Sequence, residues 1–103
     1  MKGRTFGAVT LIAGSLLAGT VQAQENKAEE CAVQAAMVMA VVESRRSGAA
    51  PQDAVRDVQQ GLEGDQAKYA SVVPAVADWV YTLPEDQLGP DVGDSWTEAC
   101  LAR

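Results

Sequence analysis

The placement of the only two cysteines constrains the fold of this chain more than any other feature. Cys31 and Cys100 stand 100 − 31 = 69 positions apart. In an exported chain, two cysteines form one bridge by default. Closing a loop of this length stabilises a small domain by roughly 4 kcal/mol in the chain-entropy treatment. A redox pair and an intermolecular bridge are the alternatives. The spacing is not Cys-x-x-Cys and the chain has no histidine to activate a thiolate, so we expect a structural Cys31–Cys100 disulfide.

The first residues predict export. Lys2 and Arg4 precede an uncharged apolar stretch over 6–18, and residues 21–23 (Val-Gln-Ala) fit a small-x-small cleavage site. A membrane anchor is the alternative, but glycine, serine and threonine dilute the stretch and no basic flank follows it. Gln24 stands where a lipoprotein would need cysteine. We therefore expect a signal peptide over 1–23, cleaved near Ala23, and a single periplasmic or secreted domain over 24–103.

The charge of the expected mature chain limits its partners. Cleavage removes Lys2 and Arg4 but no acid, which leaves 6 basic and 14 acidic side chains and a net charge of 6 − 14 = −8. Such a charge disfavours binding to nucleic acid or to an anionic membrane surface. It suits a solvated acidic surface or a cationic protein partner.

Helix-forming residues at helical spacing fill the expected domain, and no alternation typical of strands is present. The first helix should bury Cys31 and the apolar residues after it, be covered on most sides, and end at Gly48. A second helix should begin at Pro51 and end at Gly61. The third should begin after Asp65 and include Tyr81 near its end. The sequence thus predicts an all-α fold, a small bundle of four or five helices closed by one disulfide.

Three details concern the C-terminal half. Pro74 lies in phase with the apolar stripe of the third helix, so we expect a kink there in preference to a new start. Residues 82–85 and 95–98 each have the form of a capping box, which predicts a single turn through Leu88 and a short last helix capped by Ser95. Trp96 and Cys100 share one face of that helix, so Trp96 should pack beside the bridge.

No pattern of catalytic or metal-binding residues is recognisable. Without histidine, the serines lack their usual general base and a metal site lacks its commonest ligand. Asp86, Asp91 and Asp94 lie in one Gly/Pro-rich segment, where weak calcium binding is the alternative to solvated acids, but their spacing does not match an EF-hand. A glycosidase with paired carboxylates is disfavoured in so small a bundle. We expect no enzyme activity, no cofactor and no metal.

Four residues are candidate partner contacts. Arg45 and Arg46 form the only basic pair, although a position in the last turn of the first helix explains them without a partner. Trp79 and Tyr81 cannot both face inward, so one of them is the best candidate for an exposed aromatic anchor.

Residues 51–59 (Pro-Gln-Asp-Ala-Val-Arg-Asp-Val-Gln) resemble a short segment of the HdeA-type periplasmic acid-stress chaperones. The resemblance covers nine residues and implies a non-catalytic periplasmic helper that binds unfolding clients in acid. In that family the bridge does not join both ends of the mature chain. From the residues themselves we expect a non-catalytic exported binding or interaction module whose partner is another periplasmic protein. The alternatives are an acid-stress chaperone and an inhibitor or immunity protein for a cationic secreted enzyme.

Overall fold

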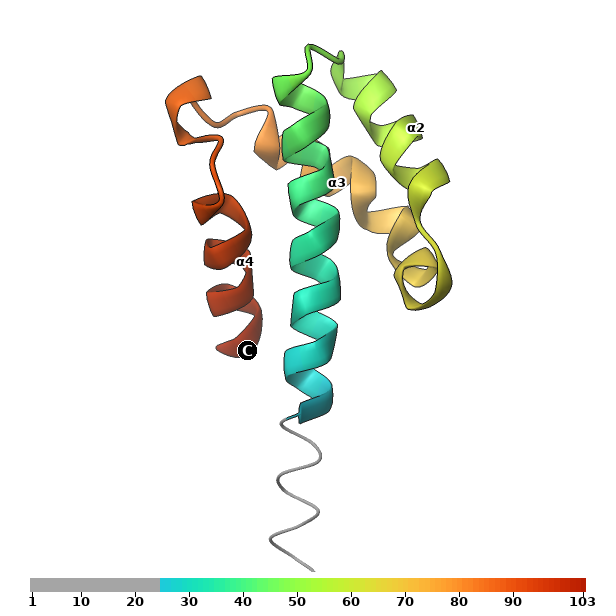
Figure 1. The fold of residues 1–103 in the computed structure, drawn as a ribbon, viewed down its shortest axis with the longest axis vertical. Coiled ribbons are helices and arrows are strands. Elements are labelled where there is room, and N and C mark those ends of the chain that lie inside the picture. The colour runs from blue at the N-terminus through green and yellow to red at the C-terminus, as the bar shows by residue number, and fades with distance from the viewer. Residues whose placement is uncertain (1–24) are drawn as a thin grey trace, which may run out of the picture.

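The computed structural model describes residues 25–103, so the signal peptide expected over 1–23 lies outside the described residues. Within this range the chain is all-helical, as predicted (Figure 1). A long first helix spans 25–46. It is followed by α2 (Pro51–Gly61), α3 (Val73–Val80) and α4 (Asp91–Leu101), with two 3-10 segments, η1 (Gly64–Val72) and η2 (Glu85–Gln87).

The first helix forms the centre of the bundle. In Figure 1, α2 and α4 lie on opposite sides of it and run against its direction, while α3 crosses behind it. Its buried side chains Met37, Val38, Val41 and Val42 pack with buried residues of α2, α3 and α4. No polar or charged side chain is buried in the described part of the chain. Nor does any helix within 25–103 have the length and apolar character needed to cross a membrane.

The ends of the first helix and of α2 follow from local chemistry. Gly48 adopts a positive φ of 94°, a conformation that other residues rarely adopt. The amides of Gly48 and Ala49 return to the carbonyls of Arg45 and Ser44, which is the Schellman arrangement that ends a helix. Pro51 then opens α2 at its first position, where a proline has no hydrogen bond to lose.

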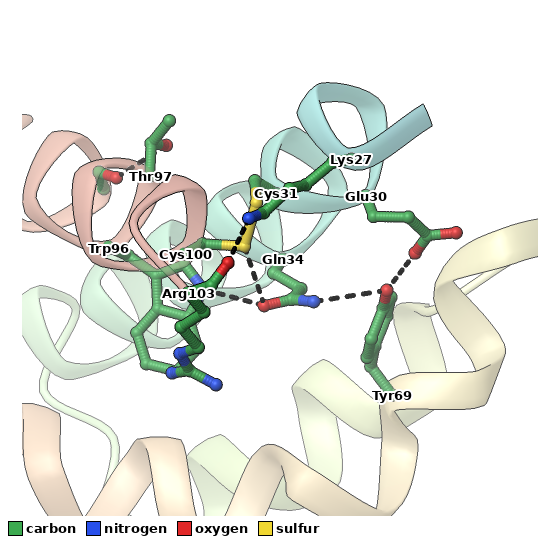
Figure 2. Close-up of a disulfide and its surroundings, with 10 residues drawn as sticks. Lys27, Glu30, Cys31, Gln34, Tyr69, Trp96, Thr97, Cys100 and Arg103 are labelled. Atoms are coloured by element: carbon green, nitrogen blue, oxygen red, sulfur yellow. Dashed lines mark hydrogen bonds between the residues drawn. A yellow bond between two sulfur atoms is a disulfide. The ribbon is translucent and has the colours of Figure 1, made fainter. Parts of the chain in front are cut away.

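The disulfide between Cys31 and Cys100 is present, with the two Cα atoms 5.7 Å apart. It joins the first helix to α4, so the predicted covalent link between the central and last helices is confirmed. Cys31 is buried, and Trp96 lies close to the bridge as expected (Figure 2).

The predicted kink at Pro74 is wrong. Residues 64–72 form the 3-10 segment η1, and an α-helix starts anew at Val73 with Pro74 in its first turn. A proline in the first turn costs no intrahelical hydrogen bond, whereas in a helix interior it would remove one. η1 has no fully buried residue, so little packing holds it to regular α geometry. Asp65 does not cap it, since the N-cap is Glu63.

The single turn predicted through Leu88 is present as η2, but neither capping box of the C-terminal half forms. α4 begins at Asp91 and places Ser95 inside the helix, while the Thr82 hydroxyl donates to the carbonyl of Trp79 at the end of α3. Gly93 also lies inside α4, against the Met39 side chain of the first helix. A Cβ on Gly93 would lie 2.9 Å from Cγ of Met39.

Candidate functional site

A groove between the first helix, α3 and α4 is the best-formed concave feature of the described residues. It encloses about 380 Å³. Its lining is mostly apolar and aromatic: Gln34, Met37, Tyr69, Val72, Ala75, Val76, Trp79, Trp96 and Arg103. We call it the tryptophan groove. Its size and composition are typical of sites that bind small molecules or apolar side chains.

Two tryptophans from different helices form one wall of the groove. Trp79 of α3 and Trp96 of α4 pack with ring centroids 5.8 Å apart and ring planes tilted by 45°. Trp79 is 37% exposed and the adjacent Val72 is 43% exposed, the two large apolar residues that the groove leaves open to solvent. Of the two aromatic candidates predicted from the sequence, Trp79 is therefore the exposed one.

Gln34 fixes the floor of the groove (Figure 2). Its Oε1 accepts a hydrogen bond from the indole N–H of Trp96 at 3.1 Å, and its amide donates to the Tyr69 hydroxyl at 3.3 Å. The Cys100 sulfur lies 3.7 Å from the same Oε1. One side chain thus orients the groove residues of η1 and α4 from the first helix. Gln34 is the only polar residue in the run 31–42, and this interruption was the signal in the sequence for its role.

A small charged network holds η1 against the first helix. The Glu30 carboxylate accepts hydrogen bonds from the Lys68 ammonium, at 2.6 Å, and from the Tyr69 hydroxyl. These two bonds lower the pKa of the Glu30 carboxyl. The hydrogen bond to Glu30 raises the pKa of Lys68. The network is exposed, so it positions the Tyr69 end of the groove without anchoring the fold.

Arg45 and Tyr81 have their polar groups engaged within the chain. Arg45 donates to the carbonyl oxygens of Val80 and Leu83, both at 2.6 Å, and its guanidinium lies 5.5 Å from the centre of the Tyr81 ring. Val80 is the last residue of α3 and Leu83 lies just beyond it, so Arg45 contacts the carbonyl end of this helix. The Tyr81 hydroxyl donates to Ala49, and partial burial raises its pKa.

Arg46 is exposed and pairs with Glu43 one turn back, at 3.3 Å. Of the four predicted contact residues, only Trp79 lines the tryptophan groove. The other eight groove residues, Gln34, Val72 and Arg103 among them, were not contact candidates from the sequence.

A second cavity adjoins the tryptophan groove at Trp79, which lines both. It encloses about 300 Å³ and also contains Leu83, Asp86, Gln87, Asp91, Val92 and Ser95. We call it the acidic hollow. No lysine or arginine lines it, and neither of its aspartates forms an ion pair within residues 25–103.

The tryptophan groove offers apolar area and aromatic faces, and the acidic hollow adds carboxylates. Within residues 25–103, no three histidine, cysteine, aspartate or glutamate side chains gather so that they could hold a metal ion. Comparison with protein-family models, curated proteins and solved structures found no match to the chain.

Proposed function

We propose that residues 24–103 form a non-catalytic binding module that acts outside the cytoplasm, after cleavage near Ala23. Its tryptophan groove receives an apolar side chain from a partner protein. The observation that carries the proposal is the exposure of Trp79 beside Val72 at the open side of a groove whose floor is fixed by Gln34. Large aromatic residues in such positions commonly supply much of the binding energy of an interface.

The groove is held in shape before any partner binds. Trp79 and Trp96 come from different helices and are held by packing, by a hydrogen bond to Gln34 and by the bridge at Cys100. A groove built in this way is largely preformed, so a partner orders few side chains on binding.

A photo-crosslinking experiment tests this function. A benzophenone amino acid replaces Val72 at the open side of the groove or, as a control, the exposed Gln52 in α2. After incubation with an envelope extract of the producing cells, position 72 should give a discrete crosslinked species and position 52 should not. The species should be competed by the unmodified chain and lost with Trp79→Ala. Identical crosslinks from both positions would refute the groove as the binding site.

The acid-stress chaperone is a second candidate, favoured by the Glu30 network. Protonation of Glu30 removes the charge that pairs with Lys68 and weakens the contacts that position η1, which supplies Tyr69 and Val72 to the groove. Acid would then expose more apolar surface. The test is ANS fluorescence from neutral pH down to about pH 3, since the dye reports exposed apolar surface. Glu30→Gln should raise ANS binding at neutral pH. No rise in acid, and no protection of an acid-stressed client, would refute this candidate.

A further inference from the structure

We propose that the occupant of the tryptophan groove is a cationic amphipathic segment of the partner protein. Its apolar side chain fills the groove, and a neighbouring lysine or arginine enters the acidic hollow. This inference rests on the proposed function and adds the chemistry of the partner to it. The observation behind it is the position of Trp79, which lines both cavities and therefore places an apolar site directly beside a carboxylate-lined one.

The charge of the hollow selects the sign of the second side chain. Asp86 and Asp91 line it from η2 and from the start of α4, and neither has a cationic partner within residues 25–103. An incoming cation gains from both carboxylates.

The spacing of the two cavities suits a helix. Both cavities include Trp79 in their lining, so the two incoming side chains lie close to each other. Residues three or four apart on a helix have Cβ atoms about 5–6 Å apart and satisfy this requirement. Docking of an amphipathic helix into an apolar groove is a recurring mode of peptide recognition.

Charge also argues against a second copy of this chain as the occupant. Each expected mature chain carries a net charge of 6 − 14 = −8. Two such chains repel one another, whereas a cationic partner is attracted over a long range and associates faster at low salt.

Tryptophan fluorescence provides a site-specific assay, because both tryptophans of the chain line the tryptophan groove. The probes are three tryptophan-free helical peptides of about four turns. Each has leucines at the same amphipathic positions, and the remaining positions are all lysine, all glutamine or all glutamate. The protein is the oxidised mature chain, and emission is followed as each peptide is added at low and at high salt.

We expect the leucine–lysine peptide to shift the emission and to bind about five- to tenfold more tightly than the leucine–glutamine peptide at low salt. The double variant Asp86→Asn/Asp91→Asn should remove this preference. The matched control Asp57→Asn/Glu63→Gln removes the same net charge from exposed positions outside both cavities and should keep it.

The remaining outcomes separate this inference from the proposed function. If all three peptides bind equally and Trp79→Ala weakens each of them, the groove binds apolar segments and the cationic inference is wrong. If the lysine preference falls by the same amount in both double variants, net charge alone explains it and the inference is wrong. If no peptide shifts the emission, both proposals fail. If sedimentation shows a dimer that Trp79→Ala dissociates, the occupant is a second copy and the inference is overturned.

Discussion

Removal of the Cys31–Cys100 bridge should cost most of the stability of this bundle and should release α4 first. α4 buries only Val92 and Gly93 completely, and Trp96 is partly buried. Besides this packing, α4 is held to the first helix by the Trp96–Gln34 hydrogen bond and by the Lys27 contact to the carbonyl oxygen of Arg103.

The magnitude follows from the length of the loop that the bridge closes. For a separation of 69 positions, the chain-entropy treatment gives about 4.4 kcal/mol at 25 °C. Small domains have a net stability of about 5–15 kcal/mol. With a urea m-value of about 1 kcal/mol/M, the unfolding midpoint should fall by about 4 M.

The assay compares the oxidised chain with the Cys31→Ala/Cys100→Ala variant and with the reduced chain, which keeps both sulfur atoms. Urea unfolding is followed by circular dichroism and by tryptophan emission, and amide exchange locates the loss of protection. We expect residues 91–101 to lose protection first, while the first helix and α2 keep theirs. Because α4 carries Trp96, the tryptophan groove should be lost when α4 detaches.

Two results would refute this reasoning. If the variant lies within about 1 kcal/mol of the oxidised chain, the bridge does not supply the main restraint on α4. If α2 loses protection before α4, the bridge stabilises the bundle globally and the attribution to one helix is wrong.

Three further predictions concern single side chains. Arg45→Ala should lower the free energy of unfolding by about 2 kcal/mol, because two carbonyls at the end of α3 lose a charged donor; in the same urea assay Arg46→Ala, which breaks an exposed pair, should change it by less than about 0.5 kcal/mol. Gly61→Ala should stabilise α2 by about 0.5–1 kcal/mol, since a Cβ there meets open space. Gly93→Ala should not stabilise α4, because its Cβ must displace Met39; a matching gain in melting temperature for both variants would contradict the close approach. Glu30 has a lowered pKa in the folded state, so its stabilising effect should be complete above the ordinary value of 4.5 and be lost as the pH falls through the lowered one. The difference in urea midpoint between the wild type and Glu30→Gln should accordingly be present at pH 7 and decrease as the pH falls below 4.5, and a difference that does not decrease in acid would contradict the assignment.

Features that depend on neighbouring residues were predictable from the sequence. Gly48 ends the first helix in the left-handed conformation, and Pro51 opens α2. Both follow from the backbone preferences of single residue types. The disulfide was predictable for a different reason, because two cysteines in a chain expected to be exported leave one intramolecular pairing.

Features that depend on packing between distant segments were not predictable in the same way. The apolar stripe through Pro74 gave no information on whether tertiary contacts hold residues 64–72 as an α-helix, and they form a 3-10 segment instead. Glycine is typical of loops, and the contact between Gly93 and Met39 of the first helix is visible only in the structure. Arg45 donates hydrogen bonds to carbonyl oxygens that lie 35 and 38 positions away in the sequence.

The candidate site shows the same limit. Sequence reasoning identified Trp79 as a possible anchor but not the groove, because the groove requires the relative positions of three helices. Val72 and Arg103 have no local pattern that marks them as groove residues, and only the placement of η1 and α4 brings them to Trp79 and Trp96.

The bridge between Cys31 and Cys100 also makes a ring of the backbone between them. Any single cleavage inside this ring leaves both pieces covalently joined, because the disulfide still connects them. The exposed segment at η2 lies inside the ring, so a protease that cuts there opens the ring and releases nothing. For a protein proposed to act outside the cytoplasm, this connectivity means that a fragment is released only after a second cut or after reduction.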